Sequence, residues 1–587
     1  MAIDTPPNNG IFSDILAKMK ELSEKLGGPY KYTALPENVT RDEVQRRAQV
    51  WADRHRRAVR LTLAAMALLA VAYFVFEFRC VRSSTAIFPA QNSVPSPSTE
   101  NHVPAQRRAV TTIKGEGEEQ VCDTPERGFQ CDAEISHFWG QYSPYFAVAP
   151  APGQLPAAVP AECTVTFAQV LSRHGARDPT AGKSQTYAAL VDRIHDSVTQ
   201  YGDGAAFLRD YKYTLGADEL TAFGEQQLVN SGVDFFQRYG HLVEADGEVE
   251  APFIRSAGQN RVVQSAQKWT EGFHRSWQEA KGNVTTTTTT TPKNGSSGGD
   301  DGYPYDILVI PEGTEYNNTL SDELCTAFEE GPDTGKAAQA TWLDAFAPPI
   351  TDRLNGAVLP GANLSREETI YMMDLCPYET VASPALAAGA TRRLSPFCDL
   401  FTADEWRSYD YHETLGKWYG YGRGSGALGP TRGVGWANEL IARLTSQPVA
   451  DRTSTNATLD GDEATFPLRR RLYADFSHDN DMSSIYAALG LYNQTEPDGL
   501  PADSRRGPGK TGGFSASWSV PFAARMYVEK MQCGGGEEEE FVRVLVNDRV
   551  IPLQNCGADE LGRCRLGKFV ESLSFARGGG NWDMCFA

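Results

Sequence analysis

One stretch of the chain places a buried strand, a polar loop and a helix in direct succession, and this succession narrows the fold class most. Residues 163–172, CTVTFAQVLS, form an apolar run typical of a central strand that is covered on both faces. The polar sequence RHGARDPT follows, and Leu190, Ile194 and Val198 then recur at helical spacing. Strand, loop and helix in this order make half of a doubly wound unit. We therefore expect an α/β fold with a doubly wound central sheet.

The loop RHGARDPT holds the residue types that phosphate chemistry needs. Ligands of doubly wound folds bind at the carboxyl ends of the strands, which is where His174 falls. Arg173 and Arg177 keep their protons at ordinary pH, and their planar guanidinium groups fit phosphate or carboxylate oxygens. A neutral imidazole between them is a workable nucleophile toward phosphorus. A surface loop with one exposed histidine fits the same short motif, so other parts of the chain must distinguish the two.

A second polar cluster offers the proton donor that a leaving alcohol would need. In YADFSHDND, residues 473–481, an apolar run ends at His478 and Asp479, and a helical pattern follows. This is again the end of a strand. Taken alone, a His-Asp pair also fits a purely structural role, so the pattern becomes informative only together with the first loop.

A further arginine-rich stretch precedes a third helix. In PFIRSAGQNRVVQSAQKWTEGF, Arg255 and Arg261 stand ahead of residues with helical spacing. These arginines could add positive charge to the same pocket. A solvated helix face is the alternative.

Residues 61–78, LTLAAMALLAVAYFVFEF, form an apolar segment with Glu77 as its one charge. Such a segment spans roughly 27 Å as a helix, which suits a thin bilayer. Positive charge is concentrated before the segment, at Arg54, Arg56, Arg57 and Arg60, with Arg79 and Arg82 behind it. This excess predicts a signal anchor with a cytosolic amino terminus and a lumenal or extracellular body. A cleaved signal peptide is the alternative, but the segment 1–60 that precedes the apolar stretch is far longer than the charged start of an ordinary signal peptide.

The remaining chain divides by composition. Residues 1–60 are predicted to form a cytosolic tail, 79–117 a flexible linker rich in Pro, Ser and Thr, and 118–587 the globular body. The pair Arg107-Arg108 in the linker suggests a site at which a protease releases the body, although an incidental pair fits equally. Within the body, residues 282–302 are a low-complexity loop that cannot build a core. The predicted protein is thus a single-pass membrane protein of the secretory pathway or the cell surface.

Cysteines and sequons agree with that location. Cys80 lies at the membrane edge, and the other ten cysteines all follow the anchor. None of them forms a close CxxC, so we expect disulfides and no metal site. Acceptor sequences for N-glycosylation begin at Asn283, Asn294, Asn317, Asn363, Asn456 and Asn493.

Overall composition excludes some classes of partner. The formal net charge of -20 disfavours nonspecific binding to nucleic acid, which needs a broad positive surface. Hydrophobic residues make up 41% of the chain, and the chain contains 10 tryptophans. This composition indicates a globular body rather than disorder. The acidic balance still leaves room for a local positive pocket, so a small phosphorylated substrate is expected there, and residues 61–78 make the membrane the other expected partner.

The ordered motifs resemble those of the histidine acid phosphatase family, within the histidine phosphatase superfamily, and most closely those of fungal phytases. RHGARDPT and FSHDN carry the resemblance, together with HFWGQYSPYF, FGEQQLVNSG, SPFCDLFTADEW, GVGWANELIARLT, VRVLVNDRVIPL and SFARGGGNWDMCFA. It extends over residues 120–587. It implies a large α/β domain with a smaller, mostly helical domain, and an active site between them that needs no metal or cofactor.

The resemblance also implies residue roles. His174 would be the phosphohistidine nucleophile and Asp479 the proton donor. The phosphate pocket would consist of Arg173, Arg177, Arg261 and His478. The implied disulfides are Cys122–Cys131, Cys163–Cys533, Cys325–Cys585, Cys376–Cys398 and Cys556–Cys564, which leaves Cys80 unpaired.

Some positions depart from the phytase pattern, and they leave the substrate open. Asp178 stands where a tyrosine is usual, and a carboxylate there could repel a polyanion or pair with an arginine. Lys183 and Lys417 are retained as candidate substrate-binding residues, but Thr186 and Gly416 replace lysines. Losing outer lysines weakens the binding of phytate more than that of a monophosphate. The implied catalytic residues are all present, so the chain is expected to hydrolyse phytate (myo-inositol hexakisphosphate) or related esters at acid pH, with the preference for phytate left open by the missing lysines. The alternatives are a broad-specificity acid phosphatase or a non-catalytic glycoprotein with a relic phosphatase fold.

Overall fold

The computed structural model describes residues 122–148, 155–245, 248–282, 303–384, 394–493, 499–534 and 539–587. Contacts divide the chain into two units, Met1–Lys114 and Gly115–Ala587, and every described residue belongs to the second unit. The predicted tail, membrane anchor and linker lie outside the described residues, as does the low-complexity loop beyond Gly282. Among the described helices, none is both long and apolar enough to cross a bilayer.

Within the described part of the second unit, eight strands form one sheet. Its order is β10-β8-β7-β1-β6-β4-β5, with β9 paired to β8. The four strands β1, β6, β4 and β5 are parallel, and the others run antiparallel to their neighbours. The strand bounds are β1 Cys163–Arg173, β4 Phe253–Ala257, β5 Leu308–Ile310, β6 Leu472–Ser477, β7 Arg525–Cys533, β8 Glu539–Val546, β9 Arg549–Ile551 and β10 Cys564–Arg565. A separate hairpin pairs β2 (Glu244–Ala245) with β3 (Glu248–Val249).

The central strands are buried, as their apolar sequences predict. Every residue of β6 is buried, and so are the last seven of β1. Parallel strands at the middle of a sheet are covered on both faces, which favours such continuous apolar runs. The central strand predicted from CTVTFAQVLS is thereby confirmed.

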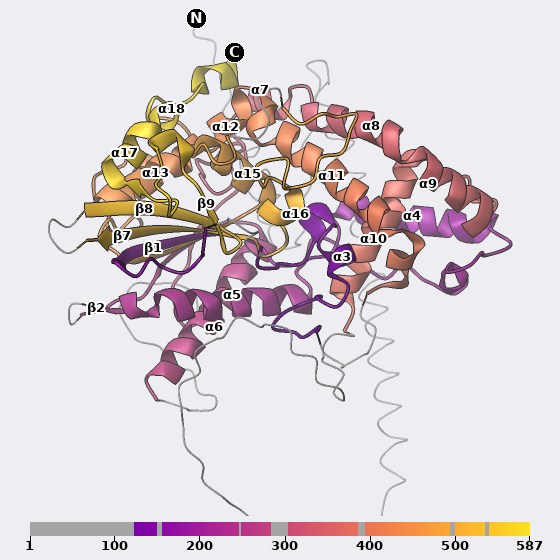
Figure 1. Ribbon diagram of the computed structural model, residues 1–587, viewed down its shortest axis with the longest axis horizontal. Coiled ribbons are helices and arrows are strands. Elements are labelled where there is room, and N and C mark those ends of the chain that lie inside the picture. Colours follow the sequence, from indigo (N-terminus) through magenta and orange to yellow (C-terminus); the bar gives the residue numbers. More distant parts are fainter. Residues whose placement is uncertain are drawn as a thin grey trace, which may run out of the picture. The chain divides into compact units, whose positions relative to one another are not determined.

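Helices cover both faces of the sheet (Figure 1). Helices α5 (Ala222–Tyr239) and α6 (Asn260–Ala280) pack together, and α6 contacts β4 and β6. On the opposite face, α17 (Leu566–Ser572) contacts β8 and α15 (Asp479–Ala488) contacts β1, with α12 (Leu428–Arg432), α13 (Val434–Thr445) and α18 (Ser574–Arg577) nearby. This arrangement confirms the predicted α/β fold with a doubly wound central sheet.

A mostly helical region adjoins the sheet. It contains α4 (Ala181–Ser197), α8 (Thr334–Phe346), α9 (Pro348–Arg353), α10 (Arg366–Ala382) and α11 (Ala403–Gly420). Helix α11 packs along α8, and α10 contacts α4, α8 and α9. The helix predicted after RHGARDPT is α4, and it lies in this helical region (Figure 1).

Two helices of this region begin with reciprocal caps. The Ser365 hydroxyl accepts a hydrogen bond from Glu368 N, and the Glu368 carboxylate accepts one from Ser365 N. Thr402 and Glu405 form the same capping box at the start of α11. These caps satisfy backbone groups that would otherwise lack partners, and they fix where each helix starts.

The segment VRVLVNDRVIPL forms a hairpin. Strands β8 and β9 are antiparallel, with Val546 opposite Arg549. Asn547 and Asp548 form the turn with φ angles of 49° and 63°. Asn and Asp tolerate this left-handed conformation better than other non-glycine residues, which explains their position here.

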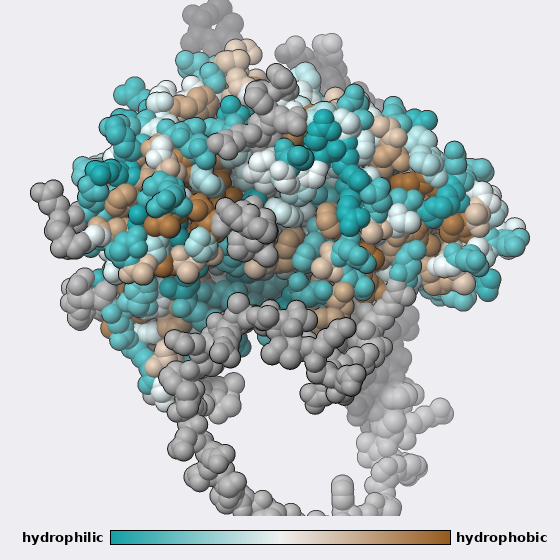
Figure 2. Space-filling model, viewed as in Figure 1, coloured by the Kyte–Doolittle hydropathy of each residue, from teal (hydrophilic) through white to brown (hydrophobic). Residues whose placement is uncertain are grey.

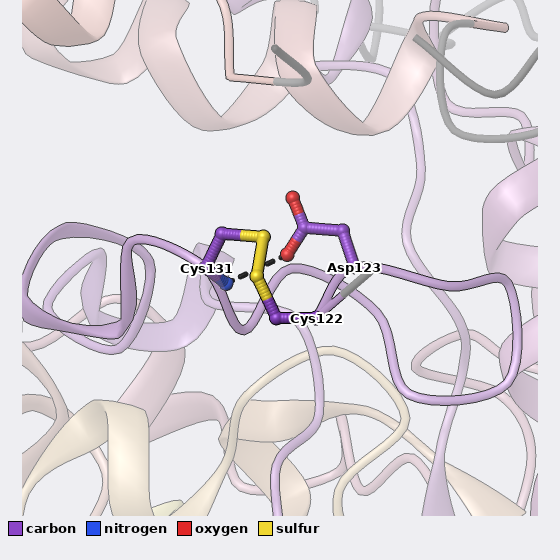
Figure 3. Close-up of side chains that lie close together, drawn as sticks. All are labelled: Cys122, Asp123 and Cys131. Atoms are coloured by element: carbon purple, nitrogen blue, oxygen red, sulfur yellow. Dashed lines mark hydrogen bonds between the residues drawn. A yellow bond between two sulfur atoms is a disulfide. The ribbon is translucent and has the colours of Figure 1, made fainter. Parts of the chain in front are cut away.

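The described residues hold five disulfides, and they are the pairs that the resemblance implies. Cys163–Cys533 joins β1 to β7, and Cys325–Cys585 holds the carboxyl terminus. At Cys122–Cys131, Asp123 lies beside the two sulfurs (Figure 3). The sulfurs are bonded to each other, and Asp123 Oδ1 accepts from Gln130 N and Cys131 N at 2.6 and 2.7 Å. This cluster therefore closes a loop rather than offering metal ligands.

The face of the protein shown in Figure 2 is mostly hydrophilic, with hydrophobic side chains scattered between polar ones. Isolated apolar residues are normal on a folded protein and define no site. The polar residues expected to carry chemistry lie instead at the carboxyl edge of the parallel strands.

Candidate active site

The strand register brings the predicted site residues to one edge of the sheet. Arg173 pairs with Ser477 in the parallel β1–β6 ladder, so His174 and His478 follow adjacent strands at the same level. Ser256 pairs with Phe476, so the start of α6, with Arg261, lies beside them. Side chains 300 residues apart in sequence thus converge because parallel strands end together.

His174 is buried, and one of its ring nitrogens already forms a hydrogen bond within the protein. The ring Nδ1 lies 2.8 Å from Gly175 O, which can only accept, so Nδ1 carries the proton. The other nitrogen, Nε2, keeps its lone pair. The backbone is fixed on both sides, because His174 N donates to Ser477 O at 3.2 Å and His174 O accepts from Ala523 N at 2.9 Å. The ring is therefore oriented before any ligand arrives.

The glycine after His174 is required by close packing. A Cβ at Gly175 would lie 2.3 Å from Gly224 O, a backbone atom that cannot move aside cheaply. Gly175 N also donates to Ser265 Oγ at 3.1 Å. The sequence His-Gly thus lets the loop lie directly against helices α5 and α6.

The surroundings of His174 keep its imidazole neutral. Burial lowers its pKa well below the ordinary value, and the positive charges of Arg173, Arg261 and Arg177 lower it further, with a smaller contribution from His478. The rings of His174 and His478 are 5.7 Å apart, edge to face. A neutral imidazole with a free lone pair beside three guanidinium groups is an arrangement that favours attack on a bound anion.

Arg173 is held rigidly at the base of the pocket. Its Nη1 donates to Gln141 O and, at 2.7 Å, to Val520 O. The guanidinium carbon lies 4.6 Å from the centre of the Phe522 ring. Arg173 Nη2 approaches Asp479 Oδ2 at 3.3 Å. The side chain is fully buried, so its orientation is set by these contacts.

Arg177 and Arg261 retain donors that the described residues leave unused. The Nε atoms of both side chains are buried without a hydrogen-bond partner within the described ranges. Arg177 Nη1 donates to Asp178 O at 2.7 Å, and Arg261 Nη1 lies 3.6 Å from Asp218 Oδ1. Burial and the charge of Arg177 lower the pKa of Arg261 to about 10. Crowded cations with spare donors make a site for an anion.

Asp479 lies between two cations. Its Oδ2 is 3.3 Å from Arg173 Nη2 and 2.6 Å from Lys417 Nζ. Burial raises the pKa of this carboxyl, but Arg173 and Lys417 outweigh burial and hold the pKa well below its ordinary value. In the free protein Asp479 is thus a carboxylate. The expected proton donor needs a change in its surroundings before it can hold a proton.

His478 has a carboxylate partner that the sequence did not reveal. His478 Nε2 lies 3.0 Å from Glu312 Oε1, and this oxygen also accepts from Gln259 N at 2.9 Å. Glu312 follows β5, whose Ile310 pairs with Ala257 of β4. It therefore stands at the same edge of the sheet and orients His478 and the start of α6 together.

The two candidate lysines differ in position. Lys417 of α11 is buried beside Asp479 and donates to Asn480 Oδ1 at 2.6 Å. Lys183 of α4 donates at 3.0 Å to both Tyr142 Oη and Asp374 Oδ2. Its ammonium is therefore already neutralised by a buried carboxylate. The structure brings Lys417 into the cluster and leaves Lys183 at its border.

Asp178 and Arg255, which the sequence analysis considered together with the site, form contacts within the fold instead. The Asp178 carboxylate accepts a hydrogen bond from the Gly216 backbone, and burial raises its pKa. Arg255 is fully buried and bonds to Asp475 and Glu439, in a cluster that also contains Arg443. Arg255 therefore belongs to a charge network within the core, whereas Arg261 belongs to the pocket.

Sequence reasoning missed several residues that shape the site. Gln141 and Tyr142 belong to HFWGQYSPYF, a segment that supported the family resemblance without suggesting a role for either residue. Phe522, Glu312 and Asp374 lie in stretches without any distinctive motif. Their contribution arises from tertiary contacts, which local patterns do not encode.

Comparisons with known proteins agree with this geometry. Residues 164–547 match the model of the histidine phosphatase superfamily, branch 2. Phytase A of Aspergillus oryzae is 50% identical over 471 residues, which cover 80% of this chain and 94% of that protein. Phytase A of Neurospora crassa is 47% identical over 500 residues, covering 79% and 95%. The crystal structure of the phytase from D. castellii aligns with a TM-score of 0.59 at 21% identity, over 80% of this chain and 92% of that one, and supports the fold.

The fold and the cationic pocket are those of a phosphoric monoester hydrolase. The chain belongs to the histidine phosphatase superfamily, which confirms the resemblance predicted from its motifs.

Proposed function

We propose that the chain hydrolyses phytate, or closely related phosphate esters of inositol, through a covalent phosphohistidine on His174. The observation that carries this proposal is the neutral His174 ring, whose free Nε2 stands among Arg173, Arg177 and Arg261. The Phytase A relatives support the choice of substrate. Asp479, at the same edge of the sheet, is the proton donor.

In the first step the pocket binds one phosphate group of the substrate. The three arginines donate to its nonbridging oxygens, and His478, oriented by Glu312, donates to another. His174 Nε2 attacks phosphorus, and a P–N bond forms as the bond from phosphorus to the ester oxygen breaks. Asp479 gives its proton to the departing oxygen, which leaves as an alcohol.

The second step returns the enzyme to its starting state. Ionised Asp479 accepts a proton from a water molecule, whose oxygen attacks phosphorus as the P–N bond breaks. Inorganic phosphate leaves, His174 recovers its lone pair, and Asp479 is again protonated. Splitting the hydrolysis in this way replaces one high barrier with two lower ones.

The charge balance of the site explains how Asp479 gains its proton. Arg173 and Lys417 hold its pKa low in the free protein. A bound phosphate dianion neutralises these cations and adds negative charge nearby, and both effects raise the pKa of Asp479. An acid medium then supplies the protonated form. The low pKa of His174 keeps the nucleophile neutral in that same medium, so both groups are ready at acid pH.

A broad-specificity acid phosphatase is the second candidate function. It is favoured by the engagement of the outer cation Lys183, whose ammonium is held by Asp374. Thr186 and Gly416 add no further charge. A non-catalytic relic is disfavoured, because all six expected catalytic and phosphate-binding residues are present at one edge of the sheet.

The experiment compares kcat/KM for phytate and for an aryl phosphate between pH 3 and 8. The phytase proposal predicts greater kcat/KM for phytate and an acid optimum, and a clear preference for the aryl ester would favour the second candidate. His174→Ala should abolish both activities. His195→Ala is the matched control, since His195 lies near the end of α4 and its Nε2 is 2.8 Å from the backbone oxygen of Leu208 rather than near a site residue. Full activity of His174→Ala would contradict both candidates.

We further propose that the enzymatic body is lumenal or extracellular and tethered by residues 61–78. The five disulfides support an oxidising compartment. The apolar segment and its flanking arginines support the anchor, and Arg107-Arg108 supports release by a protease. Sequencing the amino terminus of the mature protein distinguishes a tethered form, which starts before residue 61, from a released form.

A further inference from the structure

Tyr378 on α10 packs among aromatic rings that extend to the site residues. Its side chain is 1% exposed, and its ring centre lies 4.9 Å from that of Tyr142. The Tyr142 ring in turn lies 6.1 Å from Phe522, the ring that packs under Arg173 and lies 6.2 Å from His174. A continuous set of aromatic contacts thus connects Tyr378 to the phosphate-binding edge.

The hydroxyl of Tyr378 differs from those of other buried tyrosines. It has no hydrogen-bond partner among the residues that the structure describes. Tyr187 and Tyr409 both donate to Asp374, and Tyr239 donates to Glu529 at 2.7 Å. Burying a hydroxyl without a partner costs stability, so such a group calls for a functional explanation.

The charges around Tyr378 indicate what its missing partner is. Arg177 and Lys183 are its cationic neighbours, and Arg177 also has an unused buried Nε within the described ranges. Burial raises the pKa of Tyr378, and this outweighs the opposite effect of the two cations, so the hydroxyl keeps its proton. A protonated phenol beside a guanidinium group offers two donors and lacks an acceptor. An anion supplies one.

We propose that Tyr378 is a substrate-binding residue whose hydroxyl donates a hydrogen bond to an oxygen of the phosphate group held by Arg177. This inference rests on the proposed function, since it assumes that the pocket binds a phosphate ester. A tetrahedral phosphate presents several oxygens, so one can accept from Tyr378 while others face the arginines. The phenol thereby adds a neutral donor to a cationic site, without adding charge.

Tyr378→Phe in the full chain tests this inference, because it removes only the oxygen. The probes are inorganic phosphate, as an inhibitor and as a stabilising ligand, and an aryl phosphate as substrate. Losing a hydrogen bond to a charged group should raise the inhibition constant of phosphate and the KM by about tenfold. The kcat should stay within about twofold, because the bond is present in ground and transition states alike.

Thermal unfolding separates binding from structure. Without phosphate, Tyr378→Phe should be at least as stable as the wild type, because an unpartnered buried hydroxyl has been removed. The stabilisation by added phosphate should shrink. Tyr239→Phe is the matched control, since its hydroxyl bonds to Glu529, and it should lower stability while leaving the phosphate inhibition constant unchanged.

Each experimental outcome leads to one conclusion. An unchanged phosphate inhibition constant in Tyr378→Phe, in an active wild type, overturns the role of Tyr378 and leaves the proposed function intact. A fall in stability without phosphate, together with unchanged phosphate affinity, shows a structural hydroxyl and also overturns it. A wild type that turns over neither phytate nor the aryl phosphate overturns the proposed function itself.

Discussion

Lys417 Nζ lies 2.6 Å from Asp479 Oδ2, and this ion pair joins the helical region to the carboxyl edge of the sheet. Lys417 comes from the last turn of α11, whereas Asp479 begins α15. The two side chains are only 10% and 14% exposed, so their attraction is screened less than it would be at the surface. The protonation of the proposed acid therefore depends on a residue of the other structural region.

Replacing Lys417 with methionine should shift the pH dependence of kcat. Lys417 lowers the pKa of Asp479, so its removal raises that pKa and keeps the acid protonated to higher pH. The alkaline limb of the kcat profile should move upward by about one unit. Steady-state kinetics with a saturating aryl phosphate measures the shift.

Lys568→Met is the control for that substitution, because Lys568 forms an exposed pair with Glu571 on α17. It should leave the profile unchanged. An alkaline limb in Lys417→Met that coincides with the wild type would mean that Asp479 does not control this limb.

Asp475→Asn should destabilise the fold at neutral pH. Asp475 is buried and bonds to Arg255 and Arg443, so its loss leaves buried cations uncompensated and should cost about 3 kcal/mol. These arginines hold the pKa of Asp475 far below its ordinary value, despite the opposite effect of burial. Stability from a depressed pKa is present above the unfolded value, near 4, and is lost as pH falls toward the folded value.

Urea unfolding at pH 7 and pH 3 tests this assignment. The difference between wild type and Asp475→Asn should be large at pH 7 and should narrow at lower pH, as the unfolded-state carboxyl becomes protonated. The exposed substitution Asp583→Asn, near the carboxyl terminus, should change stability little at either pH. A difference that grows on acidification would contradict the assigned sign.

Thr186→Lys should increase the use of phytate relative to a monophosphate. Thr186 is exposed on α4, one turn beyond Lys183, so a lysine there adds an unpaired cation at the border of the site. The ratio of kcat/KM for phytate to that for an aryl phosphate should rise about threefold, and added salt should diminish the gain. Thr341→Lys, on the exposed surface of α8, is the control. Equal ratios in the two variants would argue that outer charge does not set the preference.

The glycosylation sequons should differ in occupancy. Asn317 Nδ2 donates to Thr455 O at 2.8 Å, so a glycan on that nitrogen would break a native contact. Asn456 uses its Oδ1 to cap α14 (Ala457–Asp460), and this leaves the amide nitrogen for modification. Asn363 is exposed. Peptide mass spectrometry after enzymatic deglycosylation should find modification at Asn363 and Asn456 and none at Asn317, provided that the body enters the secretory pathway.

The sequence predicted the parts of the fold that follow from local patterns. The apolar run before His174, the helix α4 and the turn at Asn547-Asp548 each have a residue signature, and all are present. The convergence of His174 with Asp479 followed from both lying at strand ends. The contacts of Glu312, Tyr378 and Asp374 depend on the packing of distant helices and strands, for which no local signature exists.

The ion pairs within the site could not be predicted from the sequence either. An aspartate predicted to donate a proton proved to be a carboxylate clamped by Arg173 and Lys417 in the free protein. Only the three-dimensional arrangement shows that substrate binding must weaken these ion pairs before Asp479 can hold a proton. The spacing of residues 173, 417 and 479 along the chain carries no such information.

The central claim is that His174 accepts the phosphoryl group. Its most direct test is rapid quenching of the enzyme in alkaline denaturant during turnover of a phosphorus-32-labelled ester, followed by mapping of the labelled peptide at alkaline pH. We expect an acid-labile, base-stable label on the peptide that contains His174, and no label in His174→Ala. Asp479→Asn should accumulate more label than the wild type, provided that breakdown of the intermediate is slowed more than its formation. Label on another residue, or its persistence in His174→Ala, would contradict it.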